Sequence, residues 1–459
     1  MAIHPIILAG GIGSRLWPAS RSNHPKQYLD LLEQGQTLLQ ASLIRARACS
    51  KLAPLVMASE QHRFLLKHQL ASMNIGDVDV LLEPISKNTA AAVLAGCLHA
   101  FKQEPCAQVL VLPSDQYLPD STLFIESVKL GFKCLSVNEI ALMGIRPTYP
   151  SDGFGYIKIS SESAGVLNVN GFTEKPNLEK AQAYLESGDY LWNAGVVMAH
   201  AKHVIDMFKE HAPKLYQSVE KAYLSRKRLY DFTVLGGELG SCPPVSFDCA
   251  ILEKAANIKA VTFTGEWDDL GTWQSLLRRR KQLGLPATMS SGKKPAMFVG
   301  VDDLLIIDDD DLTLVANQDS ISELSAMADI MVKAQRLDLL DRLETYRPWG
   351  AFKVLAQGQN FLVKQLSVQP GAQISLQSHD HRSEHWVVVA GIATVELNGH
   401  NTKLIPGEAI TINHQDKHRL ANNASQMLEV VEVQTGTYLN ESDIVRYDDV
   451  YDRHLVNKE

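Results

Sequence analysis

The pattern of hydrophobic residues changes once along the chain, and this change limits the folds that it can adopt. From Ile3 to about Arg280, short apolar runs alternate with stretches of helical periodicity. Strands that alternate with helices indicate an α/β domain built on a parallel sheet. From Tyr346 onward, apolar and polar residues alternate, and the turns are rich in Gly, Pro and Asn. That pattern favours a small antiparallel β-barrel.

The chain of 459 residues is too long for one hydrophobic core, so two or three domains are expected. We predict an α/β domain over residues 1–281, a β-rich linker over 282–345 and a barrel domain over 346–459.

The linker is expected to contain short strands and one helix. The strands are predicted around Met297–Val301, Leu304–Ile307 and Leu312–Val315, and the helix from Ala328 to Leu343. The acidic run at 308–311 lacks the spacing and the glycine of an EF-hand loop. It is therefore interpreted as a solvated turn.

Charge and hydropathy exclude two classes of partner. A formal net charge of −8 argues against a general nucleic-acid binder, which needs a basic face to meet phosphates. The first residues show no basic leader and no cleavage-like site, and no later apolar run reaches bilayer length. A cytoplasmic protein without a nucleic-acid or membrane partner is expected. The six cysteines form no C-x-x-C pair and are interpreted as reduced thiols.

A glycine-rich segment follows the first apolar run. It reads LAGGIGSRLWP from Leu8 to Pro18, and a second cation, Lys26, follows Pro25. Glycines let backbone N–H groups approach phosphate oxygens. Arg15 and Lys26 would neutralise the charge that develops as pyrophosphate leaves a nucleoside triphosphate. A P-loop is excluded because no Gly-Lys-Ser/Thr is present, and Leu16 replaces the third glycine of a dinucleotide-binding loop.

This loop, GGxGxRLxP followed by PK, resembles the activation loop of sugar-nucleotide pyrophosphorylases. With Trp17 and Pro25–Tyr28 in place, it most resembles that of the GDP-mannose pyrophosphorylase family. The resemblance implies a Rossmann-like nucleotidyltransferase domain with a mixed, mostly parallel sheet. It also implies transfer of GMP from GTP to mannose 1-phosphate with Mg²⁺ as cofactor.

The same resemblance implies roles for residues in seven segments. The cations Arg15 and Lys26 would be catalytic together with the Mg²⁺ ligands Asp115 and Asp269. The nucleotide-binding residues would be Leu8, Gly10, Gly11, Gly13, Ser14, Arg15, Glu83, Asn88 and Thr89. The sugar-phosphate-binding residues would be Gly155, Glu174, Lys175 and Asn193. For Asn88 and Thr89, a helix cap explains the local sequence about equally well.

Three elements depart from the family pattern. Gln116 stands where the family often has histidine, Ser151-Asp152 replaces a more usual Glu-Thr, and Ala194 replaces a serine. None of these changes removes a charge that the reaction needs, so they bear on sugar selectivity more than on reaction type.

The barrel segment is dense in metal-ligand side chains. Strand alternation places Gln377, His379 and His381 on one face, and a facing strand can bring His418 to the same point. Against the cupin pattern, the glycine spacings select Gln377, His379, Glu384 and His418 as ligands. The competing register uses His379, His381, His385 and His418. We prefer the first set because it keeps the spacings from Gly371 and to Gly391.

From Arg347 through Arg453, the chain resembles the phosphomannose isomerase domain of type II guanylyltransferases. The resemblance implies a cupin β-barrel that interconverts mannose 6-phosphate and fructose 6-phosphate with Zn²⁺ or another divalent transition metal. The candidates for phosphate binding or for the base are His381, Arg382, Glu432 and Arg446. A homo-oligomer, a dimer, is also expected.

Two alternatives stay open. In the first, the protein is a guanylyltransferase whose barrel is structural or serves oligomerisation. In the second, it is a non-catalytic sugar-nucleotide sensor, which the retention of Arg15, Lys26, Asp115 and Asp269 disfavours.

Overall fold

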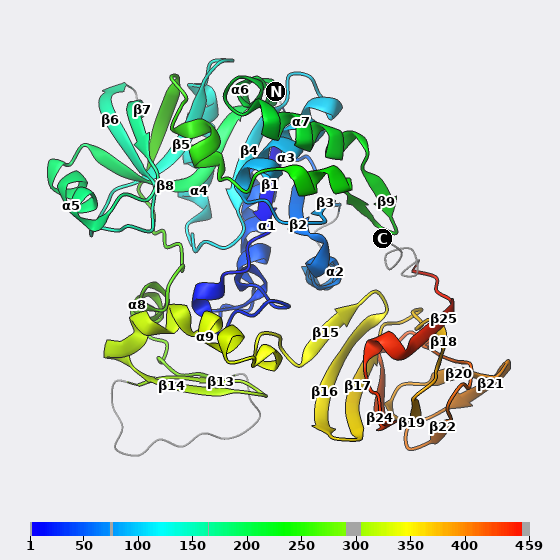
Figure 1. Cartoon of the computed structure of the whole chain (residues 1–459). Coiled ribbons are helices and arrows are strands. Elements are labelled where there is room, and N and C mark those ends of the chain that lie inside the picture. Colours follow the sequence, from blue (N-terminus) through cyan, green and yellow to red (C-terminus); the bar gives the residue numbers. More distant parts are fainter. Residues whose placement is uncertain (1, 74–76, 164, 291–303, 452–459) are drawn as a thin grey trace. The chain divides into compact units, whose positions relative to one another are not determined.

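The computed structural model describes residues 2–73, 77–163, 165–290 and 304–451 (Figure 1). The chain divides into two compact units. The first contains residues up to Arg63 and from Gln69 to Leu340, and the second contains Phe64–His68 and the chain from Asp341. In the described parts of the chain, no helix has the length and apolar character needed to cross a membrane.

The first unit is built on an 11-stranded sheet. Its parallel part has the order β4-β1-β2-β3-β10, formed by β1 (Ile3–Ala9), β2 (Leu55–Ser59), β3 (Asp79–Glu83), β4 (Gln108–Pro113) and β10 (Phe232–Val234). The short strand β9 (Lys227–Leu229) pairs antiparallel with β10. The intervening helices are α1 (Leu38–Cys49), α2 (Arg63–Met73), α3 (Thr89–Gln103) and α4 (Ser121–Lys133).

The rest of the sheet is largely antiparallel. It comprises β5 (Ile140–Ile145), β6 (Tyr156–Ser163), β7 (Val166–Thr173), β8 (Tyr190–His200) and β11 (Ile258–Phe263). Strand β8 pairs with β4, β5 and β6, and these pairings close a ring through β7 and β11. The predicted α/β domain with a mixed sheet is confirmed. Antiparallel pairs take a larger share of it than the sequence indicated, because short turns such as that between β6 and β7 force neighbouring strands to run in opposite directions.

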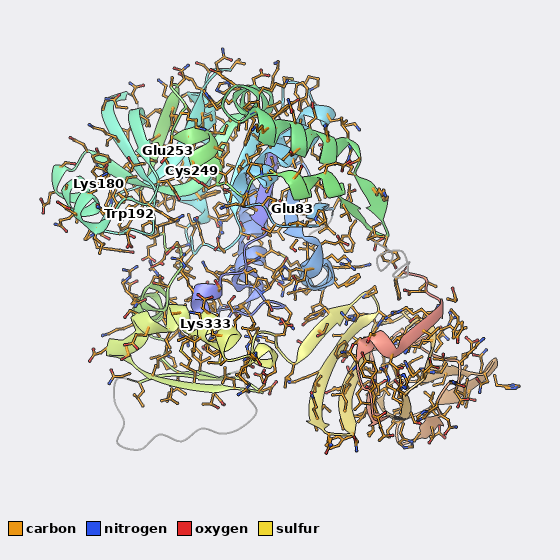
Figure 2. The ribbon with its side chains drawn as sticks, viewed as in Figure 1. Glu83, Lys180, Trp192, Cys249, Glu253 and Lys333 are labelled. Atoms are coloured by element: carbon orange, nitrogen blue, oxygen red, sulfur yellow. The ribbon has the colours of Figure 1, made fainter. Side chains whose placement is uncertain are left out.

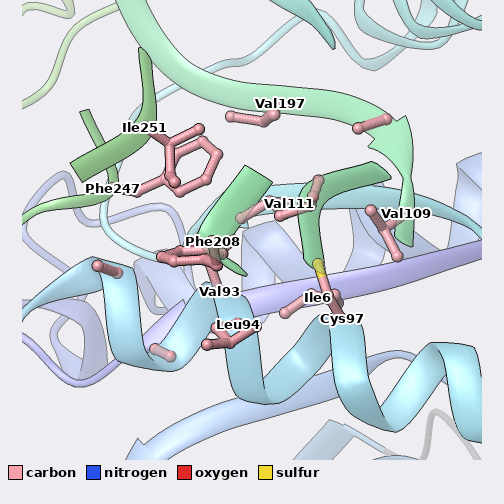
Figure 3. Packing of buried hydrophobic residues seen from close by; sticks show 14 of the residues in the cluster. Ile6, Val93, Leu94, Cys97, Val109, Val111, Val197, Phe208, Phe247 and Ile251 are labelled. Atoms are coloured by element: carbon pink, nitrogen blue, oxygen red, sulfur yellow. The ribbon is translucent and has the colours of Figure 1, made fainter. Parts of the chain in front are cut away.

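In the main hydrophobic core of this unit, α3 packs against the strands of the sheet. Figure 3 shows Ile6 of β1 and Val109 of β4 near Val93 and Cys97 of α3. A Cβ at Gly96 would lie only 2.8 Å from Cγ2 of Ile6. Helix α3 therefore approaches β1 closely, which fixes the start of this helix beside the carboxyl edge of the sheet.

Capping side chains set where two helices near this edge begin. Asn88 caps α3 by accepting a hydrogen bond from the backbone N of Thr89 at 2.7 Å. Thr272 and Ser275 form a capping box at the start of α8 (Trp273–Gln282). Since such caps satisfy backbone N–H groups that the helix leaves open, they hold the preceding loops in place. The remaining helices are α5 (Leu178–Ser187), α6 (Ala201–His211) and α7 (Pro213–Leu224).

The linker folds onto the first unit. It contains β12 (Met289–Ser290), β13 (Leu304–Asp308), β14 (Thr313–Asn317) and α9 (Met327–Lys333). Strands β13 and β14 confirm two of the predicted strands and pair with each other as an antiparallel hairpin. The strand expected at Met297–Val301 lies outside the described residues. The helix predicted from Ala328 to Leu343 is wrong in length. It ends at Lys333 because Gln335 adopts a left-handed backbone (φ 56°), and only a 3-10 turn at Leu337–Leu339 follows.

The second unit consists of two antiparallel sheets. One has the order β15-β16-β17-β24-β19-β22, with β15 (Glu344–Arg347), β16 (Gly350–Gly358), β17 (Phe361–Val368), β19 (Arg382–Ala390), β22 (Ala409–Ile412) and β24 (Leu428–Gly436). The other has the order β21-β20-β23-β18-β25, with β18 (Leu376–His379), β20 (Ala393–Leu397), β21 (His400–Leu404), β23 (His418–Ala421) and β25 (Ile444–Asp448). This is the cupin-type arrangement that the sequence predicted.

The inward-facing positions of the barrel change character along each strand. On β24, the buried residues are Leu428 and Val430, followed by Glu432 and Gln434. The paired strands β17 and β19 repeat this change, and Lys364 faces Glu432 in the register. Because alternate residues of a strand point to one face, the barrel has an apolar end that forms its core and a buried polar end.

Candidate functional site

The glycine-rich loop leaves β1 at the carboxyl edge of the sheet and is held by the segment that follows it. Nε2 of Gln27 donates to the backbone carbonyls of Ala9 and Gly11, both at 2.8 Å. Gly13 has a φ of 70°, and a Cβ there would lie 2.6 Å from Cβ of Lys26. Only glycine fits this close approach. The sequence predicted no role for Gln27, because an uncharged side chain that binds only backbone carbonyls belongs to no recognisable pattern of charged residues.

The loop borders a cavity of about 570 Å³, which is within the range of small-molecule sites. Ten of the predicted residues line it, namely Leu8, Gly10, Gly11, Gly13, Ser14, Glu83, Asn88, Thr89, Asp115 and Asn193. Arg15, Lys26, Gly155, Glu174, Lys175 and Asp269 are not among its lining residues.

Lys26 connects the loop to the ends of two other segments. Its Nζ lies 3.0 Å from Oδ2 of Asp115, which follows β4, and it also donates to the backbone carbonyl of Asp269. The Lys26 side chain is almost fully buried, while that of Asp115 is half exposed. A buried ammonium group needs such partners, so Lys26 holds Asp115 and Asp269 beside the glycine loop.

The two neighbouring aspartates before α8, Asp268 and Asp269, have different surroundings. The carboxylate of Asp268 is buried, lies 3.0 Å from Arg278 and accepts from the backbone N of Leu270 at 2.9 Å. Burial raises the pKa of Asp269, Lys26 lowers it, and the charge of Asp115 raises it. Asp268 is thus held by Arg278 and Leu270, whereas Asp269 and Asp115 are linked through their shared partner Lys26.

Arg15 lies beside the same carboxylate. A Cβ added to Gly271 would lie 2.2 Å from Oδ2 of Asp269 and 3.2 Å from a terminal nitrogen of Arg15. Gly271 therefore leaves room for both groups. The structure brings Arg15, Lys26, Asp115 and Asp269 together.

The wall predicted to recognise the base contains a buried carboxyl group. Glu83, at the end of β3 (Figure 2), is 2% exposed, and its Oε1 accepts no hydrogen bond from any residue that the structure describes. Burial raises the pKa of Glu83 to about 8. Asn88 caps α3, and both Asn88 and Thr89 line the cavity. The hydroxyl of Thr89 accepts a hydrogen bond from the backbone N of Phe247 at 2.9 Å. The cap at Asn88 is confirmed, and recognition of the base by these two residues stays a prediction.

The opposite wall contains an acid that the sequence reading missed. Asp248 lines the cavity and accepts a hydrogen bond from Nδ2 of Asn193 at 2.8 Å. Burial and the charge of Glu174 raise the pKa of Asp248 to about 6. Asp248 stands alone in the sequence, without a motif around it, so only the folded chain reveals it.

The predicted sugar-phosphate element lies next to Asp248. Nζ of Lys175 pairs with Oε1 of Glu174 at 2.7 Å, and the Lys175 side chain is 57% exposed. A Cβ at Gly155 would lie 2.9 Å from Oε2 of Glu174, so this glycine makes room for the carboxylate.

Two of the departures from the family pattern, Gln116 and Ala194, contact each other. The Gln116 side chain donates from Nε2 to the backbone carbonyl of Ala194 at 2.8 Å. Its Oε1 accepts from the indole of Trp267 at 3.1 Å. Gln116 thereby joins the segment around Asn193 to the segment around Asp269.

The acidic run of the linker is not a solvated turn, contrary to the sequence interpretation. Asp311 forms a bidentate ion pair with the buried guanidinium of Arg21, with distances of 2.5 and 2.8 Å, and Asp309 lies 3.7 Å from it. The Arg21 Nε also donates to the carbonyl of Pro18 at 3.1 Å. Since Pro18 closes the glycine-rich segment, the linker supports the loop from outside the cavity.

The second candidate site lies at the polar end of the barrel interior. Ligand atoms of His379, Glu384 and His418 are all within 4.8 Å of one another, and all three residues are buried. Nε2 of Gln377 lies 3.5 Å from Nε2 of His379. The competing register is not assembled, because the side chains of His381 and His385 are exposed.

Hydrogen bonds orient the members of this group. Nδ1 of His418 lies 2.9 Å from the backbone carbonyl of Asp416, while its Nε2 lies 3.6 Å from Oε2 of Glu384 and bonds to no described residue. Burial lowers the pKa of His418, which favours the neutral imidazole. Burial opposes ionisation of Glu384, but His379, His418 and Arg382 together hold its pKa below the usual range. A neutral imidazole held by a carbonyl and facing a carboxylate is typical of metal ligands.

The remaining barrel candidates divide into buried and exposed groups. Arg382 is buried and its Nε donates to Oε1 of Glu384 at 2.9 Å. Glu432 is buried beside Glu384 and accepts from Trp386 at 3.1 Å. Burial and the Glu384 charge raise the pKa of Glu432 to about 8. Arg446 lines the same small cavity as Arg382, Gln377 and Glu432, whereas the exposed ring of His381 packs against Tyr438 at 5.9 Å.

The fold and the two sites define a nucleotidyltransferase-type α/β domain joined to a cupin-type barrel with a buried His/Glu/His group that could hold a metal ion. Residues 4–284 match the family model described as nucleotidyl transferase, and residues 335–449 match that of the mannose-6-phosphate isomerase C-terminal domain. The chain belongs to the nucleotidyl transferase family and carries the isomerase-type domain behind it.

Relatives match along nearly the whole chain. The xanthan biosynthesis protein XanB of Xanthomonas campestris pv. campestris is 37% identical over 98% of this chain and 99% of its own. A protein of Salmonella montevideo named mannose-1-phosphate guanylyltransferase is 34% identical over 98% of this chain and 100% of its own. A solved structure from Thermus thermophilus, described as a mannose-1-phosphate geranyltransferase, matches with a TM-score of 0.64 and 26% identity over 72% of this chain and 100% of that chain.

Proposed function

We propose that the first unit transfers GMP from GTP to mannose 1-phosphate, giving GDP-mannose and pyrophosphate. The observation that carries this proposal is the position of Lys26, which joins the glycine loop to Asp115 and Asp269 at the border of the large cavity. The name of the Salmonella montevideo relative supports the same substrate pair.

The reaction needs no covalent intermediate with the protein. A phosphate oxygen of mannose 1-phosphate attacks the α-phosphorus of GTP in line, and the bond to the bridging oxygen of the β-phosphate breaks as pyrophosphate leaves. Backbone N–H groups of the glycine loop position the phosphates. Arg15 and Lys26 neutralise the negative charge that grows on the pyrophosphate.

Asp115 and Asp269 fit the role of Mg²⁺ ligands. The charge of Asp115 raises the pKa of Asp269, so the two carboxylates repel each other, and a divalent cation relieves such repulsion. Mg²⁺ takes one or two protein carboxylates and fills its other positions with water and phosphate oxygens. When bound, it would supply positive charge to the triphosphate.

The sugar would bind at the opposite wall. Glu174 would accept hydrogen bonds from sugar hydroxyl groups. Asn193, whose amide donates to Asp248, would be a further partner for them. Lys175 meets the sugar phosphate, for which it exchanges its present partner Glu174.

The test is pyrophosphate release from GTP, with and without mannose 1-phosphate. Sugar-dependent release supports the proposal, and binding of both ligands without release would instead establish a sensor. The Lys175→Ala variant should raise the KM for mannose 1-phosphate far more than that for GTP; equal effects on both would contradict the assignment of Lys175.

A second activity, interconversion of mannose 6-phosphate and fructose 6-phosphate, is favoured by the buried group of His379, Glu384 and His418. With Gln377, these residues would hold Zn²⁺ or another divalent transition metal, which polarises a carbonyl oxygen when bound. The reaction moves a proton between C1 and C2. Glu432 lines the barrel cavity whereas His381 is exposed, so we assign the proton transfer to Glu432.

An assay that detects mannose 6-phosphate formed from fructose 6-phosphate tests this second activity. Formation that a chelator abolishes and Zn²⁺ restores supports the isomerase. No formation at any metal loading would leave the barrel a structural or oligomerisation domain.

A further inference from the structure

Four cationic side chains line a small cavity at the polar end of the barrel interior, namely Arg347, Lys364, Arg382 and Arg446. Among the described residues, only two acids line it with them, Glu432 and Glu441. The sequence had indicated Arg382 and Arg446, but neither Lys364 nor Arg347. Such an excess of cations inside a barrel calls for an anionic ligand.

Lys364 is the most unusual of these cations. It lies in the middle of β17, its side chain is 7% exposed, and its Nζ lies 2.7 Å from Oε1 of Glu441. The guanidinium of Arg347 lies 3.9 Å from Oε2 of the same carboxylate. Both cations also sit over the ring of Phe352, at 4.6 and 5.2 Å from its centre. One carboxylate therefore serves two cations.

Glu441 differs from its partners because it lies at the surface. Its side chain is 44% exposed, and it is carried on a short 3-10 turn, Glu441–Asp443. The turn itself is fixed, since Asp443 accepts from the backbone N of Asp380 and of His381, both at 3.3 Å. The Glu441 side chain can rotate outward while the turn stays in place.

The cavity connects the cations to the metal-ligand group. Gln377 and Arg382 line it, and Arg382 contacts both Oε1 of Glu384 at 2.9 Å and Nε2 of His379 at 3.4 Å. A hexose 6-phosphate carries the groups that the two ends of this region could bind. Its carbonyl or hydroxyl oxygens would lie at the metal-ligand group, and its phosphate would lie at the cations.

We propose that Lys364 and Arg347 bind the phosphate of the hexose 6-phosphate, and that Glu441 is a stand-in counter-ion which this phosphate displaces. The inference rests on the proposed isomerase function. The cavity of about 50 Å³ is far below the size of ligand sites, so a side chain at its mouth must move. A phosphate brings up to two negative charges in place of one, so the buried cations stay paired after the exchange.

Steady-state isomerase kinetics on the full chain test the assignment. Lys364→Met should raise the KM for fructose 6-phosphate at least about tenfold with little change in kcat, because a hydrogen bond to a charged group is lost. Glu441→Gln should lower both this KM and the inhibition constant of inorganic phosphate, because the competitor loses its charge. Lys403→Met, at an exposed lysine of β21, is the matched control and should change neither constant.

Titration calorimetry with mannose 6-phosphate separates this inference from the isomerase proposal. Saturating GDP-mannose is present so that the first unit cannot contribute. Weaker binding to Lys364→Met and tighter binding to Glu441→Gln support the inference even if no turnover is found. Unchanged binding of mannose 6-phosphate to Lys364→Met, or weaker binding to Glu441→Gln, overturns the inference about the phosphate site. The isomerase proposal still stands in that case if the wild type is active. GDP-mannose formation in the same preparations shows that the first unit of each variant is intact, and retained metal content shows the same for the barrel.

Discussion

In the first unit, the side chains around the large cavity come from loops at the carboxyl edge of a sheet, whereas those of the barrel interior come from the strands themselves. The loop-borne groups need supports outside the cavity, such as Gln27 under the glycine loop and the Arg21–Asp311 pair behind it. The strand-borne groups are set by register, as where Lys364 faces Glu432 and Glu384 faces Gln434. The first site is thus held by side chains outside its cavity, and the second by the strand pairing of the barrel.

The largest effect is expected at Lys26. Lys26→Ala removes the charge opposite the leaving pyrophosphate and the contact that holds Asp115, so kcat/KM for GDP-mannose formation should fall about 10³-fold. Lys180→Ala, at an exposed lysine of α5 (Figure 2), should have no effect. Loss of isomerase activity in Lys26→Ala would show that the two sites are not independent.

The matching change in the barrel is Glu384→Gln. It removes the carboxylate that faces both His379 and His418, so affinity for Zn²⁺ should fall at least about 100-fold. Metal content after dialysis against a weak chelator measures this loss. Glu408→Gln, at an exposed acid in the same unit, serves as control, and equal metal retention in both variants would contradict the proposed ligand set.

The ion pair between Arg21 and Asp311, which supports the glycine-rich loop, can be removed without changing a residue that lines the cavity. Asp311→Asn replaces the bidentate partner of the buried Arg21 guanidinium, which should lower the free energy of unfolding of the first unit by about 2 kcal/mol. Denaturant unfolding followed by circular dichroism measures it. The neighbouring exposed Asp310→Asn is the matched control; if both variants unfold alike, the linker does not support the loop through this pair.

The smallest expected effect concerns pH and Glu83. Because its folded pKa of about 8 lies above the unfolded value, the unfolded state loses its proton first as pH rises. The stability that the buried, protonated carboxyl contributes is complete below the unfolded pKa and is lost as pH rises through the folded pKa. Between pH 6 and 7, the unfolding free energy of the wild type should therefore fall by about 1 kcal/mol more than that of Glu83→Gln. Parallel pH profiles would show that Glu83 is already ionised.

The part of the fold and of the sites that could be predicted from the sequence is the part carried by contiguous patterns and motifs. The fold class follows from the change of hydrophobic pattern. Arg15, Lys26, Asp115 and Asp269 could be proposed because they belong to contiguous motifs whose spacing the chemistry restricts. Their roles stay predictions, although the structure brings them together.

Other residues could not be found in this way, for physical reasons. Asp248 and Lys364 lie in segments without a recognisable motif. Only the folded chain brings them next to their partners, which are distant in the sequence. The acidic run was misread because runs of charge are usually solvated, while the partner of Asp311 is a single arginine in the first 25 residues of the chain. The end of α9 depended on the left-handed backbone of Gln335, which nothing in its neighbours demands.

We propose that one chain holds two independent sites for two steps of sugar-nucleotide synthesis. Assays of both reactions on the wild type, Lys26→Ala and Glu384→Gln test this proposal. The wild type should catalyse both reactions, Lys26→Ala should lose only GDP-mannose formation, and Glu384→Gln should lose only isomerisation. A wild type that forms no GDP-mannose, or a single variant that loses both activities while folded, would contradict it.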